Sequence, residues 1–225
     1  MQIKIPQIST QERGRDFTDS NYVYYNFFNS PKYGALNRRH HDYNERHIFM
    51  NDLLRDIYTT HGMIMNDNFR TESYSYQHSH YKLLFMTESL IYWVRKNVDD
   101  MIGFNYYAFY FSKHGTEPSK LDISSIGKLL HSKSHELYAI FQSHIDKLER
   151  INEVSNTFKH SFITSEAHNL IGKNEPVVNC LNIKWNDTSK EPQWHSYFLK
   201  QIVDDYDSFF ELSRETLKKF DWDKS

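Results

Sequence analysis

Three polar residues near the end of a long helical pattern have the types and the spacing that can do chemistry: Asn156, Lys159 and His160. On an α-helix they occupy little more than one turn, with Asn156 and His160 on one face and Lys159 beside them. A neutral imidazole can act as a general base, an ammonium can offset phosphate charge, and an amide can orient a hydroxyl. We therefore expect these residues to bind a phosphate or to move a proton. The alternative is that they are ordinary polar residues near a helix C-terminus, where the dipole favours Lys and His.

The element that must position them is a late helix of a mainly α protein. Ser134 is its expected N-cap, Glu136 suits its first turn, and the helix is expected to end near 161–165. Phe158 on its apolar stripe directs His160 away from the centre of the core, towards the edge of a groove. The predicted buried stripe consists of Leu137, Phe141, His144, Leu148, Ile151 and Phe158.

Two longer apolar patterns precede this helix. Residues 38–66 and 76–103 carry apolar side chains at three- and four-residue steps, and Gly103 is the expected end of the second helix. The aromatic run 104–111 either continues that helix after a kink or forms a strand. Ser119, followed three residues later by an aspartate, resembles a capping box, so a short helix is expected to follow.

The remaining segments are a non-helical stretch, a final helix and an N-terminal arm. Residues 166–193 break the helical rhythm and include an extended segment at 177–185, and a final helix is expected over 194–219. Only 7 Gly and 5 Pro in 225 residues favour long helices over turn-rich sheets. We predict an antiparallel four- to five-helix bundle over 38–225, with a small non-helical insertion at about 166–193 and an extended aromatic N-terminal arm over 1–37. The arm either packs its rings on the bundle or offers a stacking surface for bases.

The overall composition excludes several classes of function. A net charge of −2 argues against a broad face for duplex DNA. The single Cys180 cannot form an internal disulfide, the N-terminus lacks the apolar core of a signal peptide, and no apolar run approaches the roughly 20 residues of a membrane span. We therefore expect a cytoplasmic protein that does not enter membranes. Cys180 lies in an apolar extended segment and is expected to be a small buried residue.

No cofactor and no metal site is predicted. The chain has no glycine-rich phosphate-binding loop and no nucleophile elbow. His131 and His135 have the spacing of a zinc pair, but a break between two helices is expected there. The acidic pairs at 99–100 and 204–205 lack the Glu-x-x-His partners of a di-iron bundle.

The Asn156 to His160 element on a late helix of a bundle resembles the HEPN superfamily. That resemblance implies a small all-α domain, often homodimeric, of the kind found in toxin–antitoxin, phage-defence and RNA-processing systems. Active members carry Arg, then a polar residue that is often Asn, then His within an R-x4–6-H motif. They are similar to metal-independent ribonucleases in which two such motifs meet across a dimer cleft. The resemblance covers about residues 45–165 in outline, and its motif matches Asn156 and His160. Ser155 stands where the phosphate-holding Arg is expected, and Arg150 lies too far upstream to replace that Arg.

A second segment satisfies the whole motif, because Arg55 and His61 are separated by five residues. About two such matches are expected by chance in a chain with this Arg and His content. His61 also lies on the apolar stripe of the helix over 38–66. We therefore expect it to be a buried, hydrogen-bonded core histidine.

Three functions remain open at this point. The first is a HEPN-like protein without nuclease chemistry that binds RNA or a protein partner, as a homodimer, in a defence or toxin–antitoxin type system. The second is an active metal-independent endoribonuclease. In it, His160 takes the 2′-hydroxyl proton, Lys159 or an Arg of a neighbouring chain steadies the phosphate, and a cyclic phosphate is produced. The third is an unrelated structural or interaction bundle.

Overall fold

The computed structural model describes residues 4–9, 29–30, 32–65, 73–160, 175–182, 189 and 191–220. The described part is mainly helical, as predicted. Its helices are α1 (Leu36–Met65), α2 (Ser73–His114), α3 (Ile126–His131), α4 (Glu136–Ile140), the 3₁₀ helix η3 (Gln142–His144), α5 (Ile145–His160) and α6 (Leu199–Leu217). Its strands form two antiparallel pairs, β1 (Asn29–Ser30) with β2 (Gly34–Ala35), and β3 (Val177–Asn182) with β4 (Gln193–Phe198).

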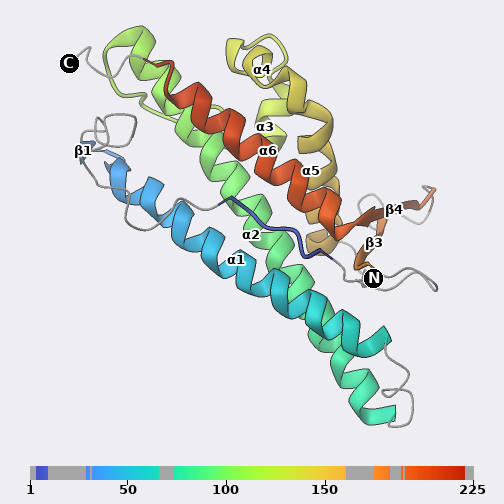
Figure 1. Ribbon diagram of the computed structural model, residues 1–225. Coiled ribbons are helices and arrows are strands. Elements are labelled where there is room, and N and C mark those ends of the chain that lie inside the picture. Colours follow the sequence, from blue (N-terminus) through green and yellow to red (C-terminus); the bar gives the residue numbers. More distant parts are fainter. Residues whose placement is uncertain are drawn as a thin grey trace.

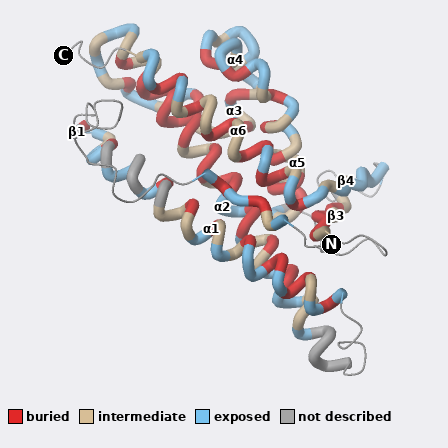
Figure 2. Tube along the Cα trace, in the orientation of Figure 1, coloured by how far each residue is buried: buried red, intermediate tan, exposed pale blue. Residues whose placement is uncertain are grey.

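The long helix α2 lies at the centre, with α1 along one side and α5 and α6 along the other (Figure 1). Side chains buried on these neighbours meet those of α2, so the core follows α2 for much of its length (Figure 2). The apolar spacing within 76–103 does correspond to a buried stripe of α2, although Phe85 beside it is exposed. The buried members of that stripe are Leu84, Ile91, Val94, Val98 and Met101.

The prediction that this helix ends at Gly103 is wrong, because α2 continues to His114. Gly103 is itself buried within the helix, and beyond it Phe104, Tyr107 and Phe111 are buried as well. One interior glycine costs a helix about 1 kcal/mol, whereas burying one large apolar side chain contributes about 1.5–3 kcal/mol. Tertiary packing of the aromatic run therefore outweighs the local break, and the run is helical and not a strand.

The short helices after α2 are capped by residues other than the predicted ones. Ser125, and not Ser119, caps α3, since its hydroxyl accepts from a backbone N–H three residues later at 3.3 Å. His135 caps α4 in place of Ser134, with its Nδ1 accepting from a backbone N–H two residues later at 3.0 Å. Both side chains satisfy N–H groups that a helix start leaves without an intrahelical acceptor.

The single late helix expected from Ser134 is divided into α4, η3 and α5. A 3₁₀ turn has three residues per turn, so it shifts the phase of the residues that follow. As a result Ile145 is buried in place of the expected His144, which is half-buried. Phe158, expected on the inner stripe, is also half-buried. The predicted end of this helix at 161–165 lies outside the described residues.

The final helix begins later than the expected 194, because residues 193–198 form β4 and pair in full register with β3. The side chains of β4 alternate: His195 and Tyr197 are half-buried, whereas Trp194 is exposed. β3 is the extended segment that the sequence predicts. Its backbone N–H and C=O groups need a partner strand, and the chain just before α6 supplies it.

Residues 4–9 contact both α1 and α6. The N–H and C=O of Ile8 bind the side-chain amide of Asn51 at 2.9 and 3.0 Å, and the N–H of Ser9 donates to Asp207 at 2.8 Å. Most of the predicted arm, and most of the insertion at 166–193, lie outside the described residues. Within the ranges given above, no helix is long and apolar enough to cross a membrane.

Candidate functional site

The three residues singled out from the sequence lie in the last turns of α5. Asn156 is half-buried, and its Nδ2 donates to Oδ1 of Asn152 at 3.3 Å. Lys159 is exposed. His160 is the last residue of α5, but its side chain lies outside what the structure describes. Asn156 and Lys159 therefore belong to the same end of α5, and the role of His160 stays a prediction.

An arginine that the motif does not indicate lies beside this group. Arg95 of α2 donates to the same Oδ1 of Asn152 and, through its Nε, to Asp99 at 2.9 Å. The second oxygen of Asp99 accepts from the N–H of Ile126 at the start of α3 at 2.8 Å. One hydrogen-bonded chain therefore runs from Asn156 on α5, through Arg95 on α2, to α3. Sequence spacing cannot reveal it, because its members come from separate helices.

The position that the HEPN-like motif assigns to arginine faces the core. Ser155 is only 1% exposed. The two cations earlier in α5 are also held within the protein: Lys147 donates to a serine hydroxyl of α6 at 2.8 Å, and Arg150 donates to Asp205 at 2.7 Å. The hydrogen bond to the Asp205 carboxylate raises the pKa of Arg150. Among the described side chains of α5, Lys159 is the cation that remains exposed.

The segment that satisfies the whole motif does not form one site. His61 is buried on the core side of α1, as predicted. Arg55 is exposed and pairs with Asp52 on the outer side of the same helix. Because His61 is buried and Arg55 is exposed and paired, the two side chains are not presented together on the surface.

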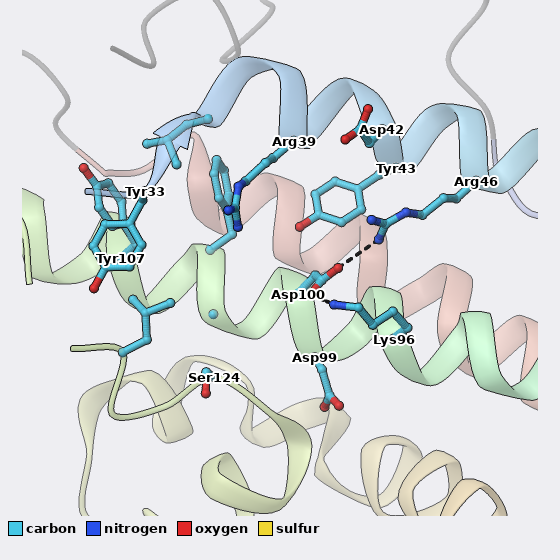
Figure 3. A pocket seen from close by; sticks show the side chains of 14 residues that line it. Tyr33, Arg39, Asp42, Tyr43, Arg46, Lys96, Asp99, Asp100, Tyr107 and Ser124 are labelled. Carbon is cyan, nitrogen blue, oxygen red and sulfur yellow. Dashed lines mark hydrogen bonds and ion pairs between the residues drawn. The ribbon is translucent and has the colours of Figure 1, made fainter. Parts of the chain in front are cut away.

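The paired carboxylates bind different cations and do not face each other. Asp99 belongs to the chain described above, whereas Asp100 accepts from Arg46 at 2.8 Å and also binds Lys96 (Figure 3). The pair at 204–205 on α6 likewise binds two separate cations. In the part of the chain that the structure describes, no three His, Cys, Asp or Glu side chains are grouped so as to hold a metal ion.

A cavity of about 390 Å³ lies between α1, α2 and the loop before α3. Its wall combines aromatic rings with charged groups, and Arg39 extends towards it from α1 (Figure 3). The guanidinium of Arg46 stands near the rings of Tyr43 and Trp93, 5.6 and 5.5 Å from their centroids. Because Arg46 also binds Asp100, much of the charge in this wall is neutralised inside the protein.

A second buried chain of hydrogen bonds connects the N-terminal segment with α1, α2 and α6. His47 donates from Nδ1 to the carbonyl of Ser9 at 3.0 Å, because a carbonyl can only accept. In the neutral imidazole the other nitrogen, Nε2, then accepts from the hydroxyl of Tyr206 at 2.5 Å. Asn97 donates to that hydroxyl at 3.1 Å, and its Oδ1 accepts from Arg46 at 2.9 Å. Burial lowers the pKa of His47 to about 4, so its imidazole is neutral at pH 7.

Cys180 on β3 is buried, as its apolar neighbours predict, and burial raises the pKa of its thiol to about 12. The thiolate is the reactive form of cysteine. We therefore expect Cys180 in the folded protein to react with Ellman's reagent at least roughly 100-fold more slowly than in the unfolded chain. The measurement compares the release of nitrothiobenzoate in buffer and in concentrated guanidinium chloride. Rapid stoichiometric release in buffer would contradict a buried thiol.

The chemistry available to the protein follows from these contacts alone, since no family model, curated protein or solved structure matches the chain. The end of α5 offers a half-buried amide and an exposed ammonium, with Arg95 held close by. Two pockets lined by aromatic and charged side chains lie along α1 and α2. Most polar groups at both places already have partners within the fold, so they are held in position. Both places can therefore serve as preformed binding surfaces.

Proposed function

We propose that this chain is a cytoplasmic, HEPN-like helical bundle with an extended aromatic N-terminal arm, and that it acts as a non-catalytic binding component of a defence or toxin–antitoxin type system. In this proposal the protein works as a homodimer and recognises a protein partner. The observation that carries the proposal is the burial of Ser155, which occupies the position where active members of the superfamily have arginine.

Catalysis at the end of α5 needs a cation that is free to hold a phosphate next to the general base. Asn156 is hydrogen-bonded to Asn152. Arg95 is shared between Asn152 and Asp99, and its side chain is only 9% exposed. This leaves the single ammonium of Lys159 among the described cations at this end of α5, and one ammonium lacks the two parallel donors with which Arg clamps a phosphate.

Three paired cations on α1, α2 and α5 favour a protein partner over RNA. RNA binding depends on Lys and Arg side chains that are free to neutralise phosphates. Arg46, Lys96 and Arg150 each bind a carboxylate of the protein itself. The net charge of −2 agrees with the absence of a strong basic bias. A protein partner presents apolar and polar groups in place of phosphates, and it therefore suits the surface around these three side chains better than RNA does.

An active metal-independent ribonuclease is the second candidate, and Arg95 is the observation that favours it. Its guanidinium reaches Asn152, one turn from Asn156, and so brings the missing residue type towards the predicted site from another helix. For this candidate Arg95 would have to release Asp99 and turn to the phosphate. His160 would then act as the general base.

We expect the wild-type protein to cleave total RNA in EDTA no faster than His160→Ala, because no free guanidinium lies at the end of α5 among the residues that the structure describes. Denaturing gels read out the cleavage, and EDTA removes metal-dependent contaminants. His131→Ala changes an exposed histidine of α3 and is the matched control. Cleavage by the wild type and the control that both His160→Ala and Arg95→Lys abolish would establish the ribonuclease. In sedimentation velocity, a monomer at every concentration would remove the homodimer from the proposal.

A further inference from the structure

An apolar groove runs along the outer side of the α1–α2 hairpin. Phe49 and Leu53 of α1, with Ser89 and Trp93 of α2, line it, and its volume is about 720 Å³. Phe49 is 68% exposed and Trp93 is 37% exposed. Large rings that are open to water form a surface that gains free energy when a partner covers it.

The apolar surface continues along α2 beyond the groove. Tyr81, Phe85 and Tyr92 are exposed, and their spacing of four and seven residues puts them in one row on α2, about 100° around the helix from Trp93. From Tyr81 to Tyr92 this row extends roughly 16 Å beside the groove, at 1.5 Å per residue. That length matches about three turns of a helix lying along α2.

The rim of the groove on α1 is acidic. Asp42, Glu45, Asp52 and Asp56 line it. Among the described residues that line the groove, Arg46 is the cation, and it already binds a carboxylate and an amide of α2. Asp52 also pairs with a neighbouring exposed arginine, and such an exposed pair is weak in water. The groove therefore presents an apolar floor beside a negatively charged edge.

We propose that this groove binds a basic amphipathic helix of a partner protein. The apolar side of that helix fills the space between Phe49 and Trp93, and its Lys and Arg side chains meet the acidic rim. The inference rests on the proposed binding function and adds the chemistry of the partner. RNA is disfavoured because its phosphates would face four carboxylates. A second copy of the chain is disfavoured because its own acidic rim would meet this one.

The Trp93 ring that lines the groove is held in place before any partner binds. The guanidinium of Arg46 lies 5.5 Å from the Trp93 ring, and the Tyr92 ring packs edge-on against Trp93 at 5.3 Å. Arg46 is itself fixed by hydrogen bonds to Asn97 and Asp100. A partly exposed Trp with few free rotamers loses little conformational entropy on binding, which is the property of an interface hot spot.

The test uses the full chain and a fluorescein-labelled synthetic helix of Leu, Lys and Ala, about four turns long, with leucines on one side and lysines flanking them. We expect saturable binding in fluorescence anisotropy that weakens as salt rises. The double variant Phe49→Ala/Trp93→Ala is expected to weaken binding at least roughly tenfold. Asp52→Lys/Asp56→Lys is expected to weaken it similarly and to favour a peptide with Glu in place of Lys.

Two matched variants test whether the effects belong to this groove. Trp194→Ala removes an exposed ring from β4, and Glu149→Lys reverses an exposed charge on α5. Both are expected to bind the basic peptide like the wild type. All substituted side chains are exposed or partly exposed, and unchanged thermal unfolding confirms that each variant folds.

Four results would overturn the inference: no saturable binding of the basic peptide, equal binding by the groove variants, binding of single-stranded RNA that Phe49→Ala weakens, or a dimer that Phe49→Ala dissociates. The last two assign the groove to RNA and to a second copy. Failure of the peptide to bind leaves the non-catalytic function of the α5 end intact. Conversely, RNA cleavage that depends on His160 overturns that function without changing the peptide result.

Discussion

Replacing Asn97 by alanine is expected to lower the free energy of unfolding by roughly 3.5–5 kcal/mol. Asn97 is completely buried, and its amide links Arg46 of α1 to Tyr206 of α6 at 2.9 and 3.1 Å. Loss of a hydrogen bond to a charged group costs about 1.5–3 kcal/mol, and loss of a neutral one costs about 1 kcal/mol. The cavity left by the amide adds about 1 kcal/mol.

Urea unfolding followed by circular dichroism measures this loss. Tyr206→Phe is the matched control, since it removes one hydroxyl of the same network and keeps the ring that packs in the core. It is expected to cost roughly 1–2 kcal/mol. The double variant should lose less than the sum of the two single losses, because both remove the same Asn97–Tyr206 hydrogen bond. A loss below about 1 kcal/mol for Asn97→Ala would show that the network contributes little to stability.

The stability of the protein is expected to fall as the pH decreases from 6.5 to about 4, because His47 is buried in its neutral form. The pKa of His47 is about 4 in the folded protein and 6.5 in the unfolded chain, with loss of hydration as the main cause and Arg214 and Arg46 as smaller ones. Between these values the unfolded chain binds a proton that the folded protein does not bind. The contribution is therefore complete above pH 6.5 and lost near pH 4, and it amounts to roughly 3 kcal/mol.

A proton on His47 would also break the hydrogen-bonded chain in which it lies. Nε2 accepts the hydroxyl hydrogen of Tyr206, and a protonated imidazole has no acceptor. Nδ1 can keep its bond to the carbonyl of Ser9 in either form. Acid is therefore expected to separate α6 from α1 at this point before it affects the contact with residues 4–9.

The comparison of wild type with His47→Gln isolates this effect. Urea unfolding at several pH values between 7 and 4 gives the slope of stability against pH for each protein. The wild type is expected to be steeper by up to about 1.4 kcal/mol per pH unit in this window. Other groups that titrate, including the half-buried His144, contribute equally to both slopes and cancel. Parallel slopes would mean that His47 binds a proton in the folded protein as readily as in the unfolded chain.

The sequence contains a signal for this network that apolar spacing alone overlooks. Asn97 stands beside Val94 and Val98 on the inner stripe of α2, and His47 stands three residues before the buried Met50 on α1. A polar residue on an apolar stripe is buried with its partners, since an unpaired buried amide or imidazole is costly. The sequence thus predicts that such residues bind one another or the backbone, although it does not say which.

The candidate site likewise combines features that the sequence predicts with features that it does not predict. The prediction that Asn156, Lys159 and His160 lie on a late helix is confirmed, since all three belong to α5. In contrast, Arg95 reaches this region from α2, and Arg150 binds Asp205 of α6. Both contacts join residues of different helices. No local pattern can report which cations are neutralised, because that depends on how far each helix is rotated and shifted against its neighbour.

By itself the amino-acid sequence determined that the protein is mainly helical and that α1 and α2 each bury one side, because a period of 3.6 residues is a local property of the chain. Only the tertiary structure decided that α2 continues through Gly103, that residues 193–198 pair with β3, and which polar side chains meet across helices. These outcomes depend on burial and hydrogen bonding between segments far apart in the chain, and such contacts can outweigh local preferences of about 1 kcal/mol.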